Sequence, residues 1–211
     1  MGAVLLVEGK DDQHIIYSLL GYHHVAETFA VKDVEGKENL LKTFRASLRI
    51  RDSEILGLVV DADDDLSACW RSLSNILVSF GYDNVPASPS ESGTVITKAE
   101  LPKVGIWIMP DNKLPGMIED FIRFLVPNKD ELWDRAENAV NDIPSAQIRF
   151  RPSYRSKAVV HTWLAWQEEP GKRLGQSITA RYLNADAVYA HLDASAVDHG
   201  LSRGPEASPL I

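Results

Sequence analysis

Two short apolar runs that each end in an acidic cluster constrain the fold of this chain more than any other feature. Residues 3–7 (Ala-Val-Leu-Leu-Val) lead into Glu8, and residues 58–60 (Leu-Val-Val) lead into Asp61 and Asp63. Continuous runs rich in β-branched residues are typical of strands buried on both faces of a parallel sheet, where ligands bind beyond the carboxyl ends of the strands. The sequence therefore predicts an α/β fold with acidic side chains at this edge of the sheet.

The rest of the chain shows alternating strand and helix patterns. We expect strands at residues 3–7, 28–34, 55–60, 94–98 and 104–109, the last two forming a hairpin, and helices at residues 12–20, 40–48, 66–80, 117–125, 131–140, 156–167 and 174–183. This order predicts a mostly parallel sheet flanked by helices, with right-handed crossovers. We therefore expect an α/β domain over residues 1–127, a helical C-terminal extension over residues 128–200 that packs on it, and a frayed tail over residues 201–211.

Composition limits the classes of protein that fit. With 211 residues and 45% hydrophobic content, the chain can bury a sizeable core. We expect no signal peptide and no membrane span, hence a cytoplasmic protein. The net charge of −8 argues against a protein that coats nucleic acid by charge alone. It does not exclude a nucleic-acid enzyme, because bound metal ions invert the field at an acidic site.

The second acidic cluster places Asp61, Asp63, Asp64 and Asp65 within five residues. Residues two apart in an extended segment point to the same side, so Asp61 and Asp63 would converge. Like charges that close either raise a pKa or recruit a cation, and Mg²⁺ prefers such oxygen ligands. The alternative is helix capping, since Asp is a favoured N-cap residue before the helix that starts near Leu66. We assign capping to Asp64 and Asp65, and metal binding to Asp61 and Asp63.

Together, the two acidic motifs resemble a known metal-dependent fold. Glu8-Gly9 after one strand, followed about fifty residues later by Asp61-x-Asp63 after another, resembles the TOPRIM domain of topoisomerases, bacterial primases and certain nucleases. Residues 7–12 are similar to the start of this domain in overcoming-lysogenisation-defect-type nucleases, in which a second acid follows the first by four positions, as Asp12 does here. Over nearly its full length the chain also resembles an uncharacterised bacterial family of small TOPRIM-related proteins, through residues 108–112, 116, 119–120, 161–166 and 170–171.

The resemblance implies an α/β, Rossmann-like TOPRIM fold in which five carboxylates hold one or two Mg²⁺ or Mn²⁺ ions: Glu8, Asp12, Asp61, Asp63 and Glu119. It also implies that Lys157 neutralises charge on a scissile phosphate. Glu8 would be a metal ligand or a general base. The residues leave alternatives open, because Glu119 lies off the apolar stripe of its helix and can pair with Arg123, and Lys157 can be an ordinary surface lysine.

A basic stretch at residues 149–157 interleaves arginines with aromatic residues. Arg151, Arg155 and Lys157 are candidates for binding nucleic-acid phosphates, since arginine both chelates phosphate and stacks on bases. A solvated linker before the next helix is the alternative.

The sequence thus predicts a metal-dependent phosphodiester hydrolase, a nuclease of TOPRIM type acting on DNA or RNA. The chain has no P-loop pattern, so any ATPase or sensor partner would be a separate polypeptide. Two other functions stay open. One is a non-catalytic TOPRIM-shaped module that binds metal or phosphate and regulates a partner, for instance in phage defence. The other is a phosphatase that forms an aspartyl-phosphate on Asp61.

Overall fold

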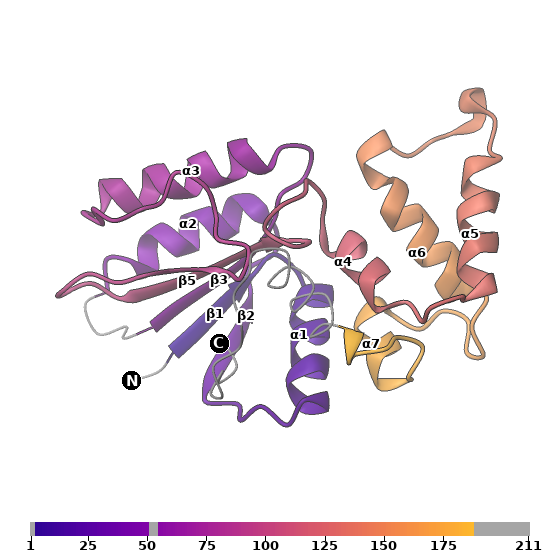
Figure 1. The fold of residues 1–211 in the computed structure, drawn as a ribbon, viewed down its shortest axis with the longest axis horizontal. Helices are drawn as coiled ribbons and strands as arrows, with labels where there is room; N and C mark the ends of the chain where they lie inside the picture. The colour runs from indigo at the N-terminus through magenta and orange to yellow at the C-terminus, as the bar shows by residue number, and fades with distance from the viewer. Residues whose placement is uncertain (1–2, 51–54, 188–211) are drawn as a thin grey trace, which may run out of the picture.

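A five-stranded sheet forms the centre of the molecule (Figure 1). The computed structural model describes residues 3–50 and 55–187. The strands lie in the order β2-β1-β3-β5-β4. Four of them pair in parallel, and β4 pairs antiparallel with β5. Their bounds are Ala3–Val7 for β1, Phe29–Asp33 for β2, Ile55–Asp61 for β3, Thr94–Ile96 for β4 and Lys103–Met109 for β5. The predicted α/β class, with a mostly parallel sheet and a terminal hairpin, is confirmed.

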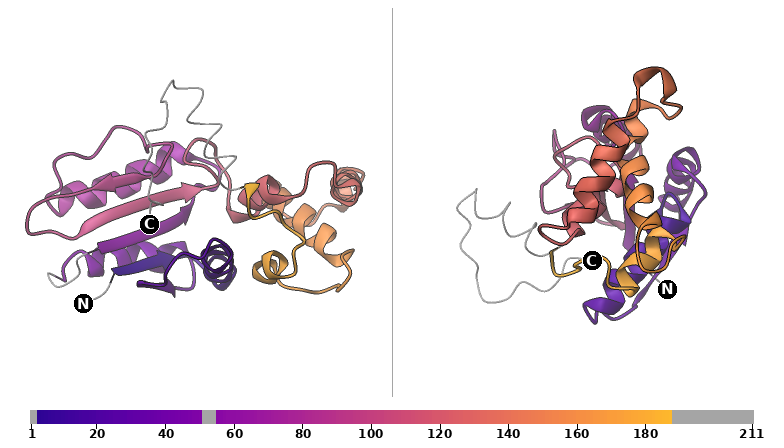
Figure 2. Two further views of the ribbon diagram at one scale, coloured as in Figure 1. Left: turned by 60° about the horizontal axis from the view of Figure 1, so that its bottom comes forward. Right: turned by 90° about the vertical axis from the view of Figure 1, so that its right-hand side faces the viewer.

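Helices cover both faces of the sheet (Figure 2). Helices α2 (Lys37–Ser47) and α3 (Leu66–Ser79) lie on one face, and α1 (Lys10–Tyr22) lies on the other. The strands are apolar on both sides for this reason. In β1, Leu6 belongs to the core under α2 and α3, whereas Leu5 and Val7 belong to the core under α1. Both cores consist of buried apolar side chains, as expected for a parallel sheet covered on both faces.

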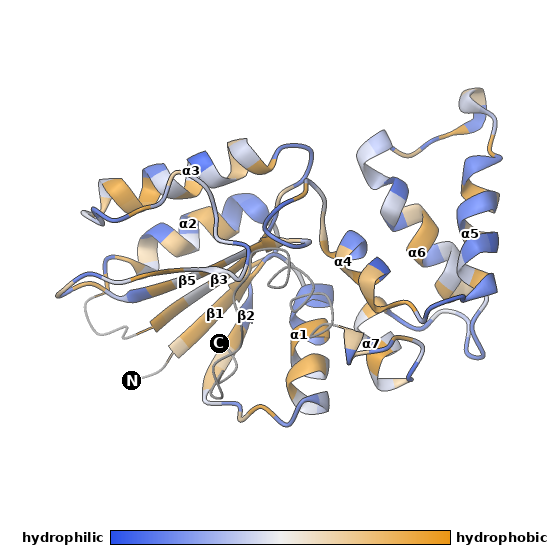
Figure 3. Ribbon diagram, viewed as in Figure 1, coloured by the Kyte–Doolittle hydropathy of each residue, from blue (hydrophilic) through white to orange (hydrophobic). Residues whose placement is uncertain are grey.

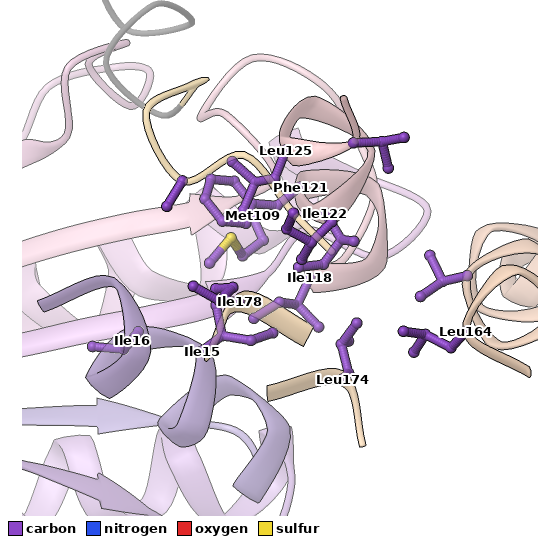
Figure 4. Close-up of a cluster of buried hydrophobic side chains, with 14 of the residues drawn as sticks. Ile15, Ile16, Met109, Ile118, Phe121, Ile122, Leu125, Leu164, Leu174 and Ile178 are labelled. Atoms are coloured by element: carbon purple, nitrogen blue, oxygen red, sulfur yellow. The ribbon is translucent and has the colours of Figure 1, made fainter. Parts of the chain in front are cut away.

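The C-terminal extension continues the core on the α1 side. It follows α4 (Ile118–Leu125), the last helix of the predicted α/β domain, and consists of α5 (Glu131–Asn141), two short 3₁₀ turns (Ser145–Gln147 and Pro152–Tyr154), α6 (Arg155–Ala165) and α7 (Leu174–Thr179). Its helices turn their apolar faces inward (Figure 3). Side chains of α1, α4 and α7 meet beside Met109 at the end of β5 (Figure 4). In the outer part, Trp133 of α5 packs edge-on against Trp163 of α6, with ring centroids 5.6 Å apart.

Most predicted elements are present, with shifted ends. Helix α1 begins at Lys10 instead of residue 12, because Gly9 is its N-cap and Asp12 reaches back to the Gly9 N–H. Helix α7 ends at Thr179 instead of residue 183, and Arg181 beyond it has a left-handed φ of 61°. None of the helices in the described ranges has the length and apolar character that a membrane span requires. The predicted tail at residues 201–211, and residues 188–200 of the predicted extension, lie outside the described residues.

Candidate metal-binding site

The chain reverses its direction across the sheet between β1 and β3, and the predicted site lies at that point. From β1 the chain moves outward to β2 and then crosses back to β3 on the other side of β1. Such a switch point leaves a crevice beyond the carboxyl ends of the two strands, where ligands of open α/β sheets bind. Glu8 directly follows β1, and Asp61 is the last residue of β3. The fold therefore brings together two acids that lie far apart in the sequence.

The turn from β1 into α1 positions Glu8 and Asp12. Glu8 Oε1 accepts a hydrogen bond from the Asp61 backbone N–H at 2.9 Å, which ties the end of β1 to the end of β3. Asp12 is in the first turn of α1, is only 7% exposed, and accepts a hydrogen bond from the Gly9 N–H at 3.1 Å. A carboxylate at this position is also favoured by the helix dipole. Asp12 therefore caps its helix while it lies inside the acidic cluster.

Asp61 joins the sheet to the C-terminal helices. Its Oδ1 accepts a hydrogen bond from the backbone N–H of Ile118, the first residue of α4, at 3.1 Å. Glu119, the next residue of α4, is 3% exposed and therefore buried beside the sheet edge. Glu119 lies off the apolar stripe of α4, as expected, and it faces the acidic site and not solvent. The acid is enclosed because the C-terminal extension covers it.

Lys157 compensates the buried charge of Glu119. Its Nζ lies 3.0 Å from Glu119 Oε1, and it is the third residue of α6. The alternative partner, Arg123, instead lies 3.8 Å from Glu137 and stacks over Trp133. Lys157 is thus held at the acidic site by a helix of the extension, 38 residues after Glu119 in the sequence.

Asp63 lies at the rim of the cluster, in a geometry that the sequence did not predict. The chain is not extended there: β3 ends at Asp61, and Asp63 has a left-handed φ of 55°. Asp63 and Asp61 therefore do not follow the two-residue alternation of a strand. The Asp63 side chain is 51% exposed and pairs with Lys37 at 2.5 Å. Lys37 was absent from the predicted site, although a cation at the start of a helix after a strand was a signal for it.

The carboxyl groups of Glu8, Asp12 and Asp61 resist ionisation, because the pKa of each is raised. Burial raises the pKa of Asp61 to about 9, and the charges of Glu8, Asp12 and Glu119 act in the same direction. Burial likewise raises the pKa of Asp12 to about 7, with Glu8 as the next cause. Burial also raises the pKa of Glu8, against the hydrogen bond from Asp61 and the nearby charge of Lys37. Several acids whose charged forms are suppressed by one another form a site that favours a cation.

The negative charge of the acidic cluster raises the pKa of both Lys157 and Lys37. Partial burial lowers the pKa of the Lys157 ammonium, but the charge of Glu119 and the hydrogen bond to it outweigh burial, so the pKa is raised overall. For Lys37, burial is again opposed and outweighed by the hydrogen bond to Asp63 and by nearby negative charges. Both side chains are therefore firmly cationic at neutral pH.

The donor chemistry of the cluster suits a hard divalent cation, because all its acidic side chains offer oxygen. Glu8 and Asp61 each use one carboxylate oxygen for a backbone N–H, and the other accepts no hydrogen bond from the described residues. In their present rotamers, no three Asp, Glu, His or Cys side chains within residues 3–50 and 55–187 are arranged to hold a metal ion. Metal binding would therefore require the carboxylates to turn toward a common centre by rotation about their χ angles.

The remaining predicted residues have simpler surroundings. Asp65 is the N-cap of α3 and accepts a hydrogen bond from the Ala68 N–H at 2.9 Å, as predicted. Arg155 reaches Asn141 with two N–H groups, at 3.1 and 2.6 Å, and Arg151 is exposed. A cavity of about 430 Å³ lies at the turn between α4 and α5, and none of the predicted site residues lines it.

The fold and the cluster define a class of protein: an α/β protein with a buried acidic site at the switch point of its sheet, closed by a helical extension. The chain belongs to the family described as protein of unknown function (DUF3226), whose family model matches residues 2–192. No match was found among curated proteins or among solved structures.

Proposed function

We propose that this protein is a metal-dependent phosphodiester hydrolase of TOPRIM type that acts on DNA or RNA. One observation carries the proposal. Acids from three separate segments, Glu8 and Asp12, Asp61, and Glu119, meet at one sheet edge, and a lysine from a fourth segment pairs with the last of them. Acids with strongly raised pKa values that meet in a crevice beside a specific charge partner are candidates for a functional site.

The inner acids Glu8, Asp12, Asp61 and Glu119 would hold Mg²⁺ or Mn²⁺. The bound metal would supply an activated water and stabilise charge on the reacting phosphate. Asp12 and Asp61 would give up their protons when the cation binds, because the cation removes the mutual repulsion that keeps them protonated. Glu8 would serve as ligand or as general base toward the attacking water.

Lys157 would act on the substrate. In the structure its ammonium neutralises Glu119. When Glu119 turns toward a metal ion, the ammonium is released to face the negatively charged phosphate in the transition state. The exposed Arg151 and Arg155 lie just before Lys157 in the chain and would contact the nucleic-acid backbone outside the site. A separate ATPase or sensor protein would then regulate access to the substrate.

The test is cleavage of labelled single-stranded DNA, double-stranded DNA and RNA in Mn²⁺, with EDTA as the metal-free reference. We expect cleavage of at least one substrate, and a loss of roughly 100-fold or more in Asp61→Asn and Glu8→Gln. Asp65→Asn is the matched control, because it makes the same change four residues away at an exposed helix cap. It should cleave like the wild type, since Asn is an equally good N-cap.

The outcomes separate the alternatives. Equal losses in Asp61→Asn and Asp65→Asn would mean that the assay reports general charge or folding. Mn²⁺ binding without cleavage of any substrate would favour the regulatory module. A trapped phosphoryl group on Asp61 would favour the phosphatase.

A further inference from the structure

Lys37 is the feature of the site that the proposed nuclease mechanism leaves without a role. It is the first residue of α2, where the helix dipole disfavours a cation. Its position is nevertheless fixed, because the preceding Gly36 donates a backbone hydrogen bond to the Glu8 carbonyl at 2.7 Å. The turn from β2 to α2 is thus tied to the end of β1, and the lysine starts directly beside the acidic cluster.

The ammonium of Lys37 bridges two oxygens at the rim of the site. Nζ donates to the backbone carbonyl of Asp61 at 2.6 Å and to Asp63 Oδ2 at 2.5 Å. Its charge also reaches Glu8. A carbonyl and two carboxylates around one positive charge are the surroundings that a divalent ion would occupy in an oxygen-lined site.

The backbone of Asp63 holds its side chain in this pair. The Asp63 N–H donates to the Gly116 carbonyl at 2.9 Å, and the Gly116 N–H donates to the Asp63 carbonyl at 2.7 Å. These two hydrogen bonds fix the left-handed conformation of Asp63. Turning its carboxylate inward would break the ion pair with Lys37 and leave the ammonium without its carboxylate partner.

We infer that Lys37 permanently occupies the outer cation position of the acidic site, so that the site binds one divalent ion, on the inner carboxylates, and Asp63 is not a metal ligand. This inference rests on the proposed metal-dependent function. Paired metal ions in hydrolases lie about 3.5–4 Å apart and share a carboxylate. The Lys37 ammonium already fills the outer of two such positions and uses its oxygen ligands, so a second ion has no place there.

The arrangement also gives Lys37 a role toward the substrate. An ammonium has three N–H groups, and two of them have acceptors among the described residues. The third would donate to a phosphate oxygen. The substrate would thus meet one metal ion and one fixed lysine, with Lys157 on the Glu119 side.

The test is the number of Mn²⁺ ions bound by the full-length protein, measured by calorimetric titration and by electron paramagnetic resonance of bound Mn²⁺. We expect one ion in the wild type and in Lys37→Arg. Lys37→Met keeps the length of the side chain but removes its charge, so Asp63 and the Asp61 carbonyl become available and two ions should bind. Lys157→Met is the matched control. It removes the other paired lysine and should still bind one ion.

Two ions in the wild type, or one ion in a folded Lys37→Met, would overturn the inference and leave the proposed function standing. No Mn²⁺ binding by the wild type would overturn both. Should Lys37→Met not fold by circular dichroism, Asp63→Asn decides. Its Kd for Mn²⁺ should stay within about threefold of wild type, whereas a loss of about tenfold or more would make Asp63 a ligand.

Discussion

Replacing Asp61 by Asn should make the metal-free protein more stable than the wild type at alkaline pH. With saturating Mn²⁺ the order of stabilities should be the opposite. The neutral amide keeps an oxygen in place to accept the hydrogen bond from Ile118. It also needs no proton, whereas burial and the charges of Glu8, Asp12 and Glu119 force the native Asp61 carboxyl to keep one. Asn and Asp are nearly equal in size, so the difference in stability between the two proteins reports the electrostatic contribution of the Asp61 carboxyl.

The magnitude follows from the raised pKa of Asp61. With a folded value of about 9 and an ordinary value of 3.8, the native state keeps a proton that the unfolded chain releases. The free energy of unfolding therefore falls as pH rises between about 4 and 9, by at most about 1.4 kcal/mol per pH unit. Asp12 adds to this fall up to its pKa of about 7. Asp61→Asn removes the Asp61 contribution, which over about four pH units is at most about 6 kcal/mol, so we expect it to be more stable than wild type by up to about 6 kcal/mol at pH 8.

Urea unfolding in EDTA at pH 5, 6, 7, 8 and 9 measures how the free energy of unfolding changes with pH in the wild type and in Asp61→Asn. The wild type should lose stability steadily with pH, Asp61→Asn should lose less, and Asp65→Asn should follow the wild type. Saturating Mn²⁺ should then raise the free energy of unfolding of the wild type above that of Asp61→Asn at pH 8. An Asp61→Asn protein that is less stable than wild type at pH 8 without metal would refute the reasoning, because the carboxylate would then be a structural hydrogen-bond partner.

Three further predictions use independent readouts. Mn²⁺ at about 100 times its Kd should add about 2.7 kcal/mol and raise the wild-type melting temperature by about 5–11 °C, and an unchanged midpoint in calorimetry would contradict a metal site. Lys157→Ala should lower turnover roughly 100-fold with little change in Mn²⁺ affinity, whereas unchanged cleavage would make Lys157 only the counter-ion of Glu119. Gly175→Ala should cost about 1–3 kcal/mol in urea unfolding, because its new Cβ would lie 2.2 Å from His14 Cβ, while Gly21→Ala, with no atom within 4 Å, should not destabilise. Equal stabilities of these two glycine variants would mean that α7 does not pack on α1 as described.

The sequence by itself determined the local elements and the sheet edge that carries the acids. Short apolar runs rich in β-branched residues, such as residues 3–7 and 55–60, favour buried strands of a parallel sheet, and an acid that directly follows such a strand lies at the carboxyl edge. The capping role of Asp65 was predictable for the same reason, since N-cap chemistry depends on neighbouring residues only.

Only the tertiary structure decided how the acids are compensated. Glu119 is buried because α6 and α7 complete the core around α4, and its partner Lys157 comes from a helix that no local pattern places there. Asp63 departs from the strand alternation because its backbone bonds to Gly116, 53 residues further on. Lys37 reaches the end of β3 because Gly36 ties the start of α2 to the end of β1, which is the neighbour of β3 in the sheet. Long charged side chains pair with residues that lie far away in the sequence, and sequence spacing does not show which of these residues are close in the fold.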